Sequence, residues 1–79
     1  MNTLEKKVLS AIHEECGSTT LAVRGGPYDS ARLLPLLTDD ERYALPAALG
    51  ALLRVGFIER AADTWYVSTD LGEDALEND

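Results

Sequence analysis

The stretch from residue 43 to residue 76 constrains the fold more than any other part of the chain. Apolar side chains recur there at steps of three and four residues, which places them on one face of a predicted helix: Leu45, Leu49, Leu52 and Val55. Gly56 follows directly, and a glycine at this place adopts the left-handed conformation that ends many helices. The pattern therefore predicts a helix with a defined end.

Two short β-prone runs come next, at residues 57–61 and 65–68. Only residues 62–64 separate them, which predicts a hairpin with a tight loop, although the strongest hairpin signals, Asn-Gly and Asp-Gly, are absent. A further helix is predicted to start at Thr69 or Asp70. Helix, glycine, hairpin and helix in this order predict a mixed α+β domain.

The N-terminal part adds a helix and a strand to this prediction. Residues 3–16 form an amphipathic pattern, with Asn2 or Thr3 as the N-cap and Gly17 as the end. Residues 18–24 are β-prone, because Leu21 and Val23 alternate with Ala22 and Arg24. We expect this segment to pair with the hairpin as a third strand.

Two more helix starts lie in the middle of the chain. Asp29 is a suitable N-cap for a short helix whose leucines are core candidates, with Pro35 in its first turn or near its end. Thr38 and Glu41 have the spacing of a capping box. Pro46 either kinks the helix that follows or begins a separate one, and we favour a short turn at residues 39–44 before the main helix.

Length and composition are those of one small domain spanning residues 1–79. No apolar run approaches the ~20 residues that a membrane span needs. A single cysteine forms no internal disulfide, so the expected location is the cytoplasm. The predicted fold class is α+β, with three main helices, a short C-terminal helix and a two- to three-stranded antiparallel sheet.

The charge is acidic, at −7, and unevenly distributed. Residues 61–79 contain six acids and no base, whereas five acids balance five arginines between residues 24 and 60. Because nucleic-acid binders gain most of their affinity from basic patches, this balance disfavours DNA as a partner. A host with high internal salt would produce the same acidic surface without any partner.

The stretches from Leu45 to Ile58 and from Ser68 to Gly72 resemble a winged-helix domain of the multiple-antibiotic-resistance-regulator type. In that family the first stretch is the recognition helix that runs into the wing, and the second joins the wing to the last helix. The resemblance implies that the solvent-facing side of the recognition helix contacts bases in the major groove. The matching positions are Tyr43, Ala44, Pro46, Ala47, Gly50 and Arg54.

These positions depart from the family pattern, because proline, alanine and glycine lack the donors and acceptors that pair with base edges. Asp63 stands in the wing loop, where a phosphate-binding wing carries Lys or Arg. Small residues at this spacing let another protein, or a second copy of the chain, approach closely. The predicted protein-interface residues are Tyr43, Pro46, Ala47, Gly50, Arg54 and, as the exposed aromatic of the second wing strand, Tyr66.

The chain has no nucleophile–histidine–carboxylate set and no metal-ligand cluster, so we expect neither an enzyme nor a cofactor. The favoured function is protein–protein contact, as a small inhibitor or adaptor of a basic, nucleic-acid-binding partner in the manner of anti-CRISPR proteins. The alternative is a dimeric DNA-binding transcriptional regulator that uses Arg32, Arg42, Tyr43 and Arg60, although these arginines are equally suited to pair with neighbouring acids.

Overall fold

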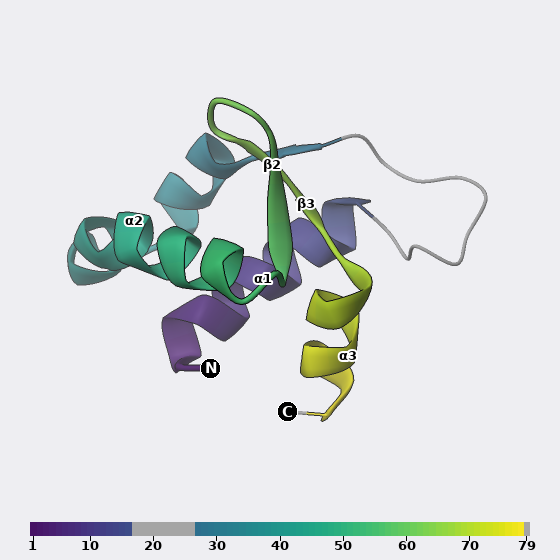
Figure 1. Cartoon of the computed structure of the whole chain (residues 1–79). Helices are drawn as coiled ribbons and strands as arrows, with labels where there is room; N and C mark the ends of the chain where they lie inside the picture. Colours follow the sequence, from purple (N-terminus) through teal and green to yellow (C-terminus); the bar gives the residue numbers. More distant parts are fainter. Residues whose placement is uncertain (17–26, 79) are drawn as a thin grey trace.

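The computed structural model describes residues 1–16 and 27–78, and it has the expected α+β class. Within these residues there are four helices and three strands (Figure 1). In chain order they are α1 (Thr3–Cys16), β1 (Tyr28–Asp29), the 3₁₀ helix η1 (Ser30–Leu36), α2 (Asp39–Arg54), β2 (Ile58–Ala62), β3 (Trp65–Ser68) and α3 (Asp70–Asn78). None of these helices is long and apolar enough to cross a membrane.

The three strands form one antiparallel sheet in the order β1-β3-β2. Tyr28 of β1 lies opposite Tyr66 of β3, and Ile58 of β2 lies opposite Ser68. The sheet has three strands, within the expected number, but its third strand is Tyr28–Asp29, where no strand was predicted. The strand predicted at residues 18–24 lies outside the described residues.

The hairpin between β2 and β3 is tighter than expected, with only Asp63 and Thr64 between the strands. Asp63 has a φ of 26°, a conformation that aspartate adopts more readily than most residues. The pairing shifts by one residue between Arg60 and Ala62, which is a β-bulge. The tight turn and the bulge together compensate for the missing Asn-Gly signal.

The capping box predicted at the start of α2 is confirmed. The Glu41 amide donates to Thr38 Oγ1 (3.2 Å), and the Thr38 amide donates to Glu41 Oε1 (2.9 Å). The prediction of a separate turn at residues 39–44 is wrong, because α2 continues through Pro46 as one helix. Pro46 removes one backbone hydrogen bond, but the cap and the burial of the leucine face outweigh this loss. Gly56 ends the segment with a φ of 82°, as expected.

The N-cap role of Asp29 is also confirmed, since its carboxylate accepts a hydrogen bond from the Ala31 amide (3.0 Å). The helix it begins is a 3₁₀ helix, which tolerates Pro35 near its end. Only part of its apolar sequence reaches the core. Leu33 and Leu37 are buried, whereas Leu34 and Leu36 are exposed.

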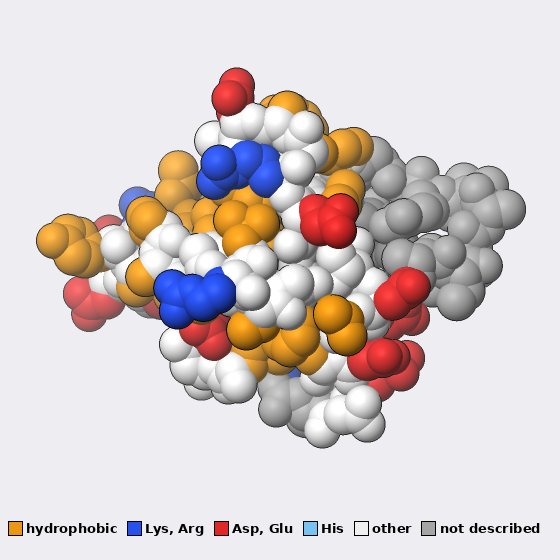
Figure 2. Space-filling view, in the orientation of Figure 1, with side chains coloured by type: hydrophobic (Ala, Val, Ile, Leu, Met, Phe, Trp, Pro, Cys, Tyr) orange, Lys and Arg blue, Asp and Glu red, His pale blue; other side chains and the backbone are white. Residues whose placement is uncertain are grey.

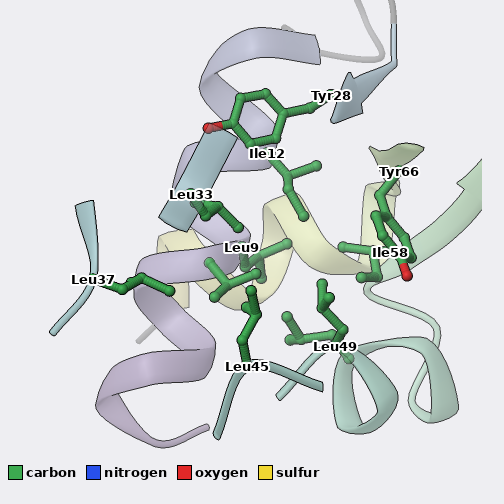
Figure 3. Packing of buried hydrophobic residues seen from close by; sticks show 11 residues of the cluster. Leu9, Ile12, Tyr28, Leu33, Leu37, Leu45, Leu49, Ile58 and Tyr66 are labelled. Atoms are coloured by element: carbon green, nitrogen blue, oxygen red, sulfur yellow. The ribbon is translucent and has the colours of Figure 1, made fainter. Parts of the chain in front are cut away.

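The core lies between α1, α2 and the sheet (Figure 3). Leu9 and Ile12 of α1 point into its centre and meet Leu45 and Leu49 of α2, with Ile58 of β2 beside them. Each of these burials contributes about 1.5–3 kcal/mol.

Val55 departs from the predicted leucine face. The helical spacing places it on the buried side, but the residue is exposed, because it follows the last residue of α2 and turns away with the helix cap. The buried face of α2 therefore ends one turn earlier than the sequence pattern predicts.

Hydrogen bonds of Thr69, at the start of α3, connect this helix to residues 56 and 57. The Gly72 amide donates to Thr69 Oγ1 (3.1 Å), so Thr69 is the N-cap. The Thr69 hydroxyl in turn donates to the Gly56 carbonyl (2.6 Å), and its amide donates to the Phe57 carbonyl (3.1 Å). Gly72 lies so close to the Phe57 carbonyl and Leu9 that a Cβ there would overlap them. Glycine is therefore needed at position 72, where α3 lies against Phe57 and Leu9.

Candidate functional site

The outward side of α2 carries five of the six predicted interface residues. Tyr43, Ala47, Gly50 and Arg54 follow one another at steps of three and four, so they share one side of the helix, with Pro46 beside them. We call these five residues the α2 face. All are exposed except Gly50, which is half-buried, and Tyr43 is the most exposed, at 92%.

Gly50 has open space where a side chain would be. A Cβ placed on this residue meets no heavy atom within 4 Å, in contrast to Gly72. Its backbone is helical and its φ is not positive. The described residues therefore give no packing or conformational reason for glycine, although glycine in mid-helix costs about 1 kcal/mol relative to alanine.

A hollow of about 260 Å³ lies between α2 and the β2–β3 hairpin. Its α2 side is apolar and its other side carries polar groups. The lining residues are Leu45, Pro46, Leu49, Gly50 and Leu53 from α2, and Ser30, Arg60, Thr64 and Tyr66 from η1, β2, the hairpin loop and β3. Figure 2 shows orange side chains between two groups of blue side chains in this part of the molecule. We call this space the wing hollow.

Tyr66 does not belong to the exposed surface that the sequence predicted. Its side chain is only 4% exposed, whereas its neighbour Trp65 is 43% exposed. Successive residues of a strand point to opposite faces, and the pairing with Tyr28 and Ile58–Arg60 turns Tyr66 toward the core. Alternation along the strand predicts that one aromatic is buried, but only the register of the sheet decides which one.

Arg32 and Arg42, two residues proposed for DNA contact, already have partners within the chain. Arg32 donates to the Glu15 carboxylate (3.2 Å), and its guanidinium lies 4.9 Å from the centre of the Tyr28 ring. Arg42 Nε donates to the Leu34 carbonyl (2.7 Å). These contacts favour a structural role for both side chains over one in binding phosphates.

Arg60 lines the wing hollow, and Arg54 follows on α2 outside its lining. Arg60 donates to the Tyr66 hydroxyl (3.3 Å), and its guanidinium lies 5.7 Å from the centre of the Tyr66 ring. Arg54 is exposed at the end of α2, one turn after Gly50, and has no hydrogen-bond or ion-pair partner among the described residues. Arg54 therefore extends the positive edge of this site toward the C-terminal end of α2.

Among residues 1–16 and 27–78, two ionisable groups have shifted pKa values, and both shifts have local causes. Burial raises the pKa of the Tyr28 phenol, and the nearby Arg32 opposes this. The Thr38 amide lowers the pKa of Glu41, with a further contribution from Lys7, whose ammonium lies 3.3 Å from the carboxylate. Both groups belong to helix starts and core packing rather than to the α2 face.

A second hollow, of about 280 Å³, has no counterpart in the sequence predictions. It lies where the start of α1 meets the end of α2, and its lining residues are Met1, Glu5, Ala51, Leu52, Val55 and Phe57. Val55, one of these residues, is exposed. Because the helical spacing of Val55 predicts burial, no sequence signal pointed to this surface.

In the described part of the chain, few side chains suited to metal binding or catalysis lie close together. Within residues 1–16 and 27–78, no three His, Cys, Asp or Glu side chains gather as a metal site. His13 Nδ1 lies 3.2 Å from Ser68 Oγ, but Ser68 is only 3% exposed, so a substrate has no access to its hydroxyl. This pair connects α1 to β3 as a buried polar contact.

No family model, curated protein or solved structure matches the chain.

Proposed function

We propose that this chain is a winged-helix module that acts by protein–protein contact through the α2 face. The order helix, strand, helix, helix, hairpin and the sheet order β1-β3-β2 are those expected of a winged helix, with α2 in the place of the recognition helix. In this proposal the α2 face meets another protein instead of the major groove.

Gly50 carries the proposal. A glycine in the middle of a helix lowers stability, and nothing among the described residues uses the space that its missing side chain leaves. A partner surface that approaches α2 closely would use this space. The neighbouring residues suit such a partner, because the exposed Tyr43 ring offers a large, rigid contact and Ala47 is small.

DNA binding is the second candidate, and only the fold favours it. The α2 face supplies one tyrosine hydroxyl and one guanidinium for base edges over its whole length. Three acids occupy the first turn of α2, where they repel phosphates. Arg32, Arg42 and Arg60 are engaged with groups of the chain itself.

In this proposal the acidic residues form a second contact surface, separate from the α2 face. Four of them lie on α3, namely Asp70, Glu73, Asp74 and Glu77, and none lies on the α2 face. A basic, nucleic-acid-binding partner, as an inhibitor or adaptor would require, therefore meets acids along α3 while the α2 face makes the close contact. The acids add long-range attraction to such a partner.

The test is capture of partners from source-cell lysate with the tagged chain, with and without nuclease. Gly50→Arg is the blocking variant, because arginine is a better helix former than glycine and the site has room for its Cβ. Leu36→Arg is the matched control, since it makes the same charge change at an exposed position on η1, outside both the α2 face and α3. Thermal unfolding of both variants establishes that they fold.

The proposal expects a stoichiometric protein that survives nuclease, binds the Leu36→Arg variant and is lost with Gly50→Arg. Recovery of nucleic acid alone, with salt-sensitive duplex binding that Arg42→Ala abolishes, would instead establish a DNA-binding regulator. Equal capture by both variants would remove the α2 face from the interface.

A further inference from the structure

We infer that the wing hollow receives one large apolar side chain of the partner, and that this side chain is flanked by a carboxylate. The inference rests on the proposed function, because it assigns a chemical identity to what meets the α2 face. The partner segment is thus locally acidic, in contrast to the basic character expected of a partner that meets α3.

The shape of the hollow supports the apolar part of this inference. Three leucines, Leu45, Leu49 and Leu53, line one side, and Gly50 leaves an opening between them and the solvent. The volume of about 260 Å³ accommodates one large side chain. The Tyr66 ring lies at its far side, and an aromatic or leucine side chain would pack against it.

The charges around the hollow support the acidic part. The chain carries −7 overall, yet residues 42–58 contain two arginines and no acid. Arg60 lines the hollow itself, and Arg54 lies one helical turn beyond Gly50. Glu59 precedes Arg60 in the same strand, so its side chain points to the opposite face of the sheet.

Two further carboxylates adjoin the lining in sequence: Asp63 is exposed in the hairpin loop beside Thr64, and Asp29, beside Ser30, already has partners. Asp29 accepts hydrogen bonds from the Thr64 hydroxyl (2.8 Å) and from the Ala31 amide (3.0 Å). The Arg60 guanidinium donates to a neutral group, the Tyr66 hydroxyl. The guanidinium has further N–H donors, so an incoming carboxylate would accept a charge-assisted hydrogen bond from it, which is stronger than a neutral one.

The net charge of the chain does not prevent this recognition. At physiological salt the Debye length is about 8 Å, so distant acids on α3 are largely screened at the hollow. Arg60, which lines the hollow, and Arg54 at the end of α2 supply positive charge, while the distant acids slow the approach of an acidic segment at low salt. In this inference the hollow binds the apolar side chain of the partner while the arginines bind the acids that flank it.

The test uses three capped tripeptides with the ¹⁵N-labelled full chain: tryptophan between two aspartates, tryptophan between two lysines, and alanine between two aspartates. Amide shifts are followed up to about 10 mM peptide, where even a millimolar complex is mostly formed. The first peptide should shift the amides of Gly50, Leu53, Thr64 and Tyr66 and bind roughly fivefold more tightly than the lysine peptide. The alanine peptide should leave these amides unshifted.

Two variants separate the two parts of the inference. Arg60→Gln should bring the aspartate and lysine peptides to equal affinity, and Gly50→Leu should abolish binding of both by filling the opening. Tighter binding of the lysine peptide, or no shift at these amides with any peptide, would overturn the inference. Such a failure is distinct from that of the proposed function, which stands as long as Gly50→Arg alone prevents capture of the partner protein.

Discussion

Replacing Gly50 by alanine should stabilise the chain, because the new methyl group has free space and alanine is the better helix former. No heavy atom lies within 4 Å of the position that the Cβ would occupy, so no contact has to move. The gain equals the helix-propensity difference, about 1 kcal/mol. For a domain of this size, that corresponds to a rise in Tm of about 4–8 °C.

The same substitution at Gly72 is the matched control and should act in the opposite direction. A Cβ at Gly72 would overlap the Phe57 carbonyl, a backbone atom that a side-chain rotation does not move. We expect a loss of about 1–3 kcal/mol or more. The two variants thus differ in sign although both replace a helical glycine by alanine.

Circular dichroism at 222 nm during urea and thermal unfolding measures both changes. Equal slopes of the free energy against urea concentration would establish that the variants and the parent unfold in the same way. An unchanged or lowered stability of Gly50→Ala would refute the reasoning, because it would mean that the fold itself needs glycine at this place. The case for a partner surface at Gly50 would then be lost.

Three further outcomes are expected. Thr38→Ala should cost about 1 kcal/mol of unfolding free energy because it removes the cap of α2, while Thr38→Ser should restore most of it in the same urea assay. Glu41 has a lowered pKa in the folded chain, so its contribution to stability is present at neutral pH. This contribution is lost as the pH falls below the ordinary glutamate value of about 4.3. Between pH 7 and pH 3, the Tm of Glu41→Gln should therefore fall less than the Tm of the parent. His13→Ala should cost about 1–3 kcal/mol, because it leaves the buried Ser68 hydroxyl without this partner, and a double-mutant cycle with Ser68→Ala should show coupling between the two positions.

The sequence by itself determined the local elements, because their signals are local. The residues of α1, the capping box at Thr38, the left-handed Gly56 and the hairpin all follow from propensities and spacings of a few residues. The outward positions of α2 were predicted from the resemblance to a winged helix, which places Tyr43 and Ala47 on the solvent side of the recognition helix. Only the continuity of α2 through Pro46 places both residues on one side of a single helix.

Tertiary structure decided what depends on residues distant in the chain. The register of β3 against β1 and β2 buries Tyr66 and exposes Trp65, which alternation along one strand leaves undetermined. The continuity of α2 through Pro46 depends on packing of its leucines against α1, which outweighs one lost hydrogen bond. The wing hollow exists only because the hairpin folds back beside α2. The same folding places Arg60 and Gly50 in the lining of one hollow.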